Sequence, residues 1–280
     1  MIVALPYPAQ MRIGALLGGA TRFLLPRRRR VAQTNLALCF PALEATERAT
    51  LLRAHFRSLG RGVIETALAW WGDTRALERR CPVVGEQHLR AALAHGKGVI
   101  LLSAHFTTLE IGGRLLAARV PFHVVYRPYA DPLLEALTCR ARTRRFGKAI
   151  PKHDTRALLA SLKSNVPVWY APDQHAGGPA STFAPFFGIP AATLTTTSRL
   201  ARISGAPVVP FFALRLTGGA GYLLMLCPAL TDFPGGDDAA DSARLNRLLE
   251  DVVREMPDQY LWVHRRFKTA PDGAAPPYAE

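Results

Sequence analysis

The chain changes its hydrophobic pattern near residue 80, and this change constrains the fold more than any other feature of the sequence. Before it, apolar residues recur at helical spacing, and the longest predicted helix covers residues 45–71. From Val83 on, short apolar runs alternate with amphipathic helices. This alternation is typical of an α/β protein in which helices flank a largely parallel central sheet. We therefore expect such a sheet, preceded by an N-terminal helical region.

The pattern also gives approximate element boundaries. The predicted apolar face of the 45–71 helix consists of Leu51, Leu52, Phe56, Leu59, Val63 and Leu68. Strands and helices after Val83 are predicted at residues 99–104, 109–118, 122–126, 133–145, 166–171, 198–204, 208–214, 222–227 and 243–256. Glycines between 218 and 221 suit a hairpin. The chain is expected to divide into an N-terminal helical, membrane-associating region (1–80), an α/β domain (81–270) and an irregular tail (271–280).

The charge of the chain limits its partners. The 280 residues carry a formal net charge of +14, which favours a polyanion such as nucleic acid, anionic lipid or an acidic protein. A nucleic-acid-binding module would interleave aromatic and basic residues in a recognisable pattern, and none is found, so nucleic acid is not expected. The cysteines lack metal-ligand spacing, and no metal site is expected; they are Cys39, Cys81, Cys139 and Cys227.

An apolar stripe near the N-terminus has two interpretations. It consists of Ile13, Leu16, Leu17, Ala20 and Leu24, and four consecutive arginines follow at 27–30. No stretch approaches the ~20 apolar residues that a membrane span needs. The stripe suits a helix that lies in a membrane interface beside anionic head groups. A helix that packs on the protein's own core, with a solvated basic end, explains the pattern equally well.

The most informative residues for chemistry follow the first buried run. His105 lies just beyond the predicted strand, and Glu110 comes five positions later. In a continuous helix the two would point about 140° apart, but a His on the preceding loop allows the first helical turn to bring the carboxylate under the imidazole. The pair then suits a general base with its orienting acid. The structural alternative is a capping box, with Thr107 as N-cap and Glu110 reaching back.

Two further polar residues follow predicted strands. Arg127 comes after the 122–126 run, and Asp173 after the 166–171 run. Because ligands gather beyond the carboxyl ends of parallel strands, a base, a cation and an acid are expected at one edge of the sheet. Arg127 suits either a phosphate ligand or an ion-pair partner of Asp173.

Taken in order, the motifs resemble the lipid A biosynthesis lauroyl/myristoyl acyltransferase family. This family belongs to the lysophospholipid acyltransferase superfamily, which is marked by His-x4-Asp/Glu. The matching blocks run along almost the whole chain, at residues 35–41, 105–110, 126–128, 169–174, 183–188, 192–196, 209–211 and 259–268. Two positions depart from the pattern. His175 stands where an acidic residue is expected, and the chain starts close to Leu5, where members usually carry a longer hydrophobic anchor.

The resemblance implies a glycerol-3-phosphate acyltransferase-like fold and a specific reaction. An acyl chain would move from acyl carrier protein to the hydroxyl of a 3-hydroxyacyl chain on a lipid A precursor, with no cofactor. By matching position, His105 would be the base and Glu110 its partner, while Arg127, Asp173 and Gln174 fall in blocks near the substrate. The family acts at the cytoplasmic face of the inner membrane, so we expect peripheral binding or a truncated N-terminal anchor.

Two alternatives to this reaction stay open at the level of sequence. The first is acyl transfer to another lipid acceptor, such as an ornithine lipid or a lysophospholipid. The second, which belongs to a different class, is a non-catalytic basic protein that binds membranes through its net charge of +14.

Overall fold

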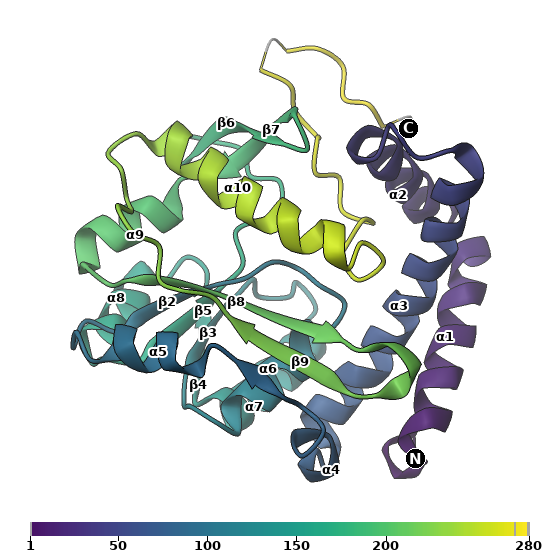
Figure 1. The fold of residues 1–280 in the computed structure, drawn as a ribbon, viewed down its shortest axis with the longest axis horizontal. Helices are drawn as coiled ribbons and strands as arrows, with labels where there is room; N and C mark the ends of the chain where they lie inside the picture. The colour runs from purple at the N-terminus through teal and green to yellow at the C-terminus, as the bar shows by residue number, and fades with distance from the viewer. Residues whose placement is uncertain (1, 272, 279–280) are drawn as a thin grey trace.

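The N-terminal part of the chain is helical, as predicted. The computed structural model describes residues 2–271 and 273–278. After a 3₁₀ turn at Ile2–Ala4, the helices are α1 (Tyr7–Leu24), α2 (Pro26–Cys39), α3 (Ala45–Trp71) and α4 (Arg75–Glu78). Figure 1 shows α1 alongside α3 at one edge of the molecule. None of the helices in the described part of the chain combines the length and the apolar character that a membrane span needs.

A seven-stranded, mostly parallel sheet forms the centre of the rest of the chain, which confirms the predicted fold class. Its strand order is β1-β9-β8-β2-β5-β3-β4, and β8 and β9 pair antiparallel as the predicted hairpin. The strands are β1 (Val83–Val84), β2 (Val99–Leu102), β3 (His123–Tyr126), β4 (Lys148–Pro151), β5 (Pro167–Tyr170), β8 (Val208–Arg215) and β9 (Tyr222–Leu226). A separate antiparallel ribbon contains β6 (Ser181–Phe186) and β7 (Ile189–Leu194).

Helices cover both faces of the sheet (Figure 1). They are α5 (Glu86–Leu93), α6 (Leu109–Ala117), α7 (Pro132–Phe146), α8 (Thr155–Lys163), α9 (Thr196–Ser204) and α10 (Asp238–Glu255). Side chains alternate along a strand, so Val99 and Leu101 of β2 pack with α5 and α6, whereas Ile100 and Leu102 pack with α8, α9 and α10. Burial on both faces explains why β2 is an unbroken apolar run rather than an alternating one.

Several elements had no clear signal in the sequence. These are β1, β4, β6, β7, α5 and α8. In β4 only Ile150 is buried, so its strand has little apolar pattern. Pro185 and Pro190 lie opposite each other in the β6–β7 ribbon, where proline argues against a strand when the sequence is considered alone.

The apolar stripe of α1 faces solvent. Leu16 and Leu24 are 74% and 73% exposed, while the face of α1 that packs on α3 contains Gly14 and Gly18. The helix does pack on the protein's own core, as one interpretation held, but it does so through the face with Met11, Gly14 and Gly18, and the leucines of the stripe are left exposed. Val63, which was predicted on the apolar face of α3, is also exposed.

Glycines allow α1 and α3 to pack backbone to backbone. A Cβ added at Gly60 of α3 would lie 2.0 Å from the carbonyl oxygen of Gly14.

Gly60→Ala should therefore destabilise the protein by about 1–3 kcal/mol, the usual cost of overpacking, as measured by urea denaturation. Gly19→Ala is the matched control, because nothing lies within 4 Å of its added Cβ and alanine favours a helix by up to about 1 kcal/mol. Equal stability of the two variants would contradict the close packing.

Candidate active site

The register of two neighbouring strands brings His105 and Asp173 together. β2 and β5 are paired in parallel, with Leu102 opposite Tyr170. His105 follows Leu102 by three residues, and Asp173 follows Tyr170 by three, so both reach the same height at the carboxyl edge of the sheet. The imidazole Nδ1 lies 2.6 Å from Oδ1 of Asp173. The backbone N–H of His105 also donates to both carboxylate oxygens at 3.1 Å.

The electrostatics of this contact keep Asp173 ionised and determine which ring nitrogen of His105 donates. The Asp173 side chain is 2% exposed, and burial alone would raise its pKa, but the charge of His105 and the hydrogen bonds from it outweigh burial and lower the pKa below its usual range. The ionised carboxylate only accepts, so Nδ1 of His105 donates. Nε2 has no hydrogen-bond partner among the described residues, and the His105 side chain is 31% exposed. The arrangement leaves Nε2 able to take a proton from an incoming group.

Glu110 does not contact His105 as the spacing predicted. Its carboxylate accepts from Nε1 of Trp70 at 2.8 Å and from the guanidinium of Arg142. Among the described residues, no hydrogen bond joins Glu110 to His105. The physical reason is that α6 begins at Leu109, so the first turn of the helix directs Glu110 toward α3 and α7 rather than back to the loop. The imidazole partner is supplied by the neighbouring strand instead.

The capping-box interpretation is wrong as well. The N-cap of α6 is Thr108, and no side-chain hydrogen bond caps the helix. The hydroxyl of Thr107 lies 2.9 Å from that of Ser58 and accepts from Arg215 at 3.3 Å. Thr107 therefore links the loop after His105 to α3 and β8.

The other predicted site residues also lie at the carboxyl edge of the sheet, but they form no hydrogen bond or ion pair with the side chains of His105 and Asp173 among the described residues. Arg127 directly follows β3 and is exposed, with no ion pair among the described residues. The suggested ion pair with Asp173 is therefore wrong, and Arg127 as a phosphate ligand stays a prediction. Gln174 is half-buried beside Asp173, and its role also stays a prediction. The backbone N–H of His175 donates to Nε2 of His264 at 2.9 Å.

A C-terminal segment supports the His105 loop, a role that the sequence did not reveal. Leu261 donates its N–H to the His105 carbonyl at 2.9 Å, and Thr107 donates to the Gln259 carbonyl at 2.7 Å. Burial lowers the pKa of nearby His264 to about 4, so this imidazole is neutral at pH 7. The segment lies within the 259–268 block on which the family resemblance rests, and that block was the only signal available.

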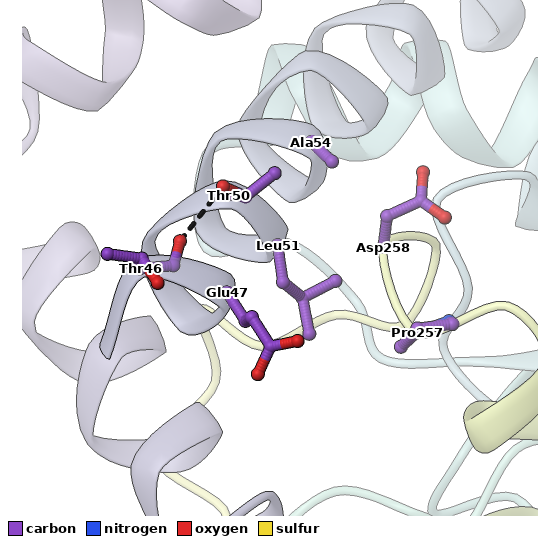
Figure 2. Close-up of a pocket in the computed structure, with 7 residues that line it drawn as sticks. All are labelled: Thr46, Glu47, Thr50, Leu51, Ala54, Pro257 and Asp258. Carbon is purple, nitrogen blue, oxygen red and sulfur yellow. Dashed lines mark hydrogen bonds between the residues drawn. The ribbon is translucent and has the colours of Figure 1, made fainter. Parts of the chain in front are cut away.

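A shallow groove lies beside this segment, between the first half of α3 and the loop at Pro257 and Asp258 (Figure 2). Leu51 projects from the helix toward that loop. None of the predicted site residues lines the groove. In the described part of the chain, no group of three or more His, Cys, Asp or Glu side chains has the arrangement of a metal site.

The geometry places an imidazole at the carboxyl edge of a parallel sheet, with a buried carboxylate against it, which is an arrangement that suits a general base. Comparison with known proteins identifies the family. A sequence model of the bacterial lipid A biosynthesis acyltransferases matches residues 1–269. The lipid A biosynthesis lauroyltransferase of Escherichia coli K12 is 38% identical over 279 residues, which cover 99% of this chain and 91% of the relative.

Two further relatives support the same assignment. The lipid A biosynthesis palmitoleoyltransferase of Escherichia coli K12 is 37% identical, with 99% of this chain and 90% of the relative covered. The lipid A biosynthesis myristoyltransferase of the same organism is 25% identical, with 89% and 78% covered. The chain belongs to the bacterial lipid A biosynthesis acyltransferase family, and it is therefore an acyltransferase.

The buried histidine that contacts the loop at Asp258 predicts that the free energy of unfolding depends on pH. His55 is fully buried, its Nδ1 donates to the Asp258 carbonyl at 3.1 Å, and burial lowers its pKa to about 4. Below pH 6.5, His55 becomes protonated in the unfolded chain but stays neutral in the folded chain. The free energy of unfolding therefore decreases as the pH falls from 6.5 toward 4. Between pH 7 and pH 5 the loss should be roughly 2 kcal/mol.

The variant His55→Asn keeps a donor at the Nδ1 position and removes the titration. Its unfolding free energy, measured in denaturant at both pH values, should fall by roughly 2 kcal/mol less than that of the parent protein. Parallel losses in the two proteins would show that His55 is not the group responsible.

Proposed function

We propose that this enzyme transfers a fatty acyl chain from acyl carrier protein to the hydroxyl of a 3-hydroxyacyl chain on a lipid A precursor. Family membership supports a lipid A acceptor. The names of the relatives, lauroyltransferase and palmitoleoyltransferase, support a fatty acyl donor. The net charge of +14 suits both an acidic carrier protein and a phosphorylated acceptor, because opposite charges steer their encounter.

The observation that carries the proposal is the contact between His105 and Asp173. Nε2 of His105 takes the proton of the lipid hydroxyl as its oxygen attacks the thioester carbonyl. The tetrahedral intermediate then collapses, the carbon–sulfur bond breaks, and the carrier thiolate takes the proton from the imidazolium. Asp173 holds Nδ1–H and stabilises the imidazolium that forms between the two steps. The lipid alcohol is the nucleophile, so the enzyme supplies no serine or cysteine.

Glu110 is proposed to act through its neighbours rather than on the imidazole. Its carboxylate joins Trp70 of α3 to Arg142 of α7, and the Arg142 guanidinium lies 5.6 Å from the ring centre of Tyr126 at the end of β3. The pair therefore fixes the start of α6, four residues after His105, against the elements around it. Glu110 is in this account a positioning residue. Arg127 and Gln174 remain the proposed substrate contacts.

The protein is proposed to bind peripherally to the cytoplasmic face of the inner membrane. The support is the exposed apolar stripe of α1, followed by the four arginines at 27–30. We propose that residues 1–80 serve this association while residues 81–270 carry the acyl transfer.

Loss of either partner in the central contact should abolish most activity. His105→Ala should reduce acyl transfer by roughly 10²–10⁴-fold, the usual scale for a general base. Asp173→Asn should cause a loss of similar order, because an amide no longer enforces the Nδ1–H tautomer. The measurement is transfer from acyl carrier protein to the purified lipid A precursor, detected by mass spectrometry. Turnover near that of the parent protein in a folded His105→Ala variant would refute the mechanism.

Glu110→Gln should act mainly on stability. The side chains of Glu110 and Arg142 are 11% and 13% exposed, so removing the carboxylate leaves a guanidinium mostly buried without its counter-charge. We expect a loss of roughly 1–3 kcal/mol in the free energy of unfolding. The double variant Glu110→Gln with Arg142→Gln should recover part of that loss. Additive losses would contradict a coupled pair.

A further inference from the structure

A second pocket lies between α1, α3 and the turn that follows β8, and neither His105 nor Asp173 lines it. Its volume is about 560 Å³. One wall is apolar and comes from Met11, Ala15 and Leu16 of α1. The rim opposite is the 3₁₀ turn Thr217–Gly219, where a Cβ at Gly218 or Gly219 would meet nothing within 4 Å. No neighbouring group therefore packs against these two glycines.

Four arginines line the pocket: Arg12, Arg57, Arg61 and Arg215. Arg57 and Arg61 lie one turn apart on α3, so their side chains are neighbours on the helix surface. Among the described residues, Arg12, Arg57 and Arg61 take part in no ion pair, in contrast to Arg215. Like charges gathered around a cavity repel one another unless an anion lies between them.

Among the described residues, the acidic groups of the region form no ion pair with Arg12, Arg57 or Arg61. Glu65 accepts from Arg215 through both oxygens at 2.6 Å, and it also accepts from the Tyr222 hydroxyl at 2.7 Å. Burial raises the pKa of Asp258, although Arg215 and Arg61 oppose the shift. Glu65 thus pairs with Arg215, and among the described residues the guanidinium groups of Arg12, Arg57 and Arg61 have no carboxylate partner.

The framework of the pocket is fixed before any ligand binds. The glycine contacts hold α1 against α3, and the Tyr7 hydroxyl donates to that of Tyr222 at 3.0 Å. Arg215 is buried, and four of its five N–H groups are used by Glu65, Ser58 and Thr107. The fifth N–H has no acceptor among the described residues. The helices and Arg215 are thus held in place, so an anion that binds here orders only the side chains of Arg12, Arg57 and Arg61.

The surface next to the pocket is apolar. Leu16 lines the pocket and also belongs to the exposed stripe, together with Leu17 and Leu24. A ligand that places a phosphate among the arginines and runs a hydrocarbon chain along this stripe would satisfy both surfaces. We propose that this pocket binds the phosphate of an anionic membrane phospholipid, whose acyl chains lie along α1. The site is separate from the catalytic contact, and the proposal does not depend on the reaction assigned above.

The test compares the parent protein with two double variants of equal charge. Arg57→Gln with Arg61→Gln removes two arginines from the pocket. Arg156→Gln with Arg247→Gln removes two exposed arginines of α8 and α10 that take part in no ion pair among the described residues. Binding is measured by sedimentation with phosphatidylcholine vesicles, with and without phosphatidylglycerol, at one ionic strength. The pocket variant should bind the anionic vesicles about tenfold more weakly, and the control within about twofold of the parent.

A third variant, Leu16→Ser, tests the apolar surface next to the pocket, since it should weaken vesicle binding while it leaves the arginines in place. Equal losses in the pocket and control variants would show a net-charge effect and overturn the proposal, as would no loss in either. A raised KM for the lipid A precursor in detergent micelles, with unchanged vesicle binding, would assign the pocket to the acceptor and likewise overturn it. Vesicle binding requires no turnover, so its result is independent of the acyl-transfer assay.

Discussion

The site of this acyltransferase depends on one buried carboxylate that is held against one imidazole. Asp173 is almost fully enclosed, and His105 offers it two donors, the ring Nδ1–H and the backbone N–H. These donors keep the carboxylate ionised in a place where burial alone would favour its neutral form. The carboxylate in turn fixes the tautomer of the imidazole and leaves Nε2 without a hydrogen-bond partner among the described residues. The parallel register of β2 and β5 brings together the two loops that follow these strands, and this register produces the contact.

The sequence predicts the class of fold because burial leaves a periodic trace. The unbroken apolar run of β2 and the long amphipathic α3 both follow from which faces are buried, and α3 has the predicted bounds. The sequence pattern also predicts that His105, Arg127 and Asp173 follow strands at one edge of the sheet. The sequence pattern does not predict the order of the strands in the sheet. Only the adjacency of β2 and β5 makes Asp173 the partner of His105, and that adjacency arises from contacts between segments about 70 residues apart.

Glu110 shows why spacing alone misassigned the acid. A carboxylate five positions after a histidine reaches it only if the helix starts in a particular orientation, and the start of α6 is set by tertiary contacts. Trp70 and Arg142, both distant in sequence, bind Glu110 and turn it away. Arg142 is mostly buried in this ion pair, whereas Arg140 and Arg144 of the same helix are exposed. Nothing in the local sequence distinguishes Arg142 from these two exposed arginines.

The central claim, that Asp173 orients His105, is tested most directly by ¹⁵N NMR of the histidine rings, with His105→Gln used to assign the signal. The account predicts that neutral His105 is the Nδ1–H tautomer, with an unprotonated Nε2, and that this holds in Glu110→Gln. An Nε2–H tautomer, or a tautomer that changes when Glu110 loses its charge, would contradict it.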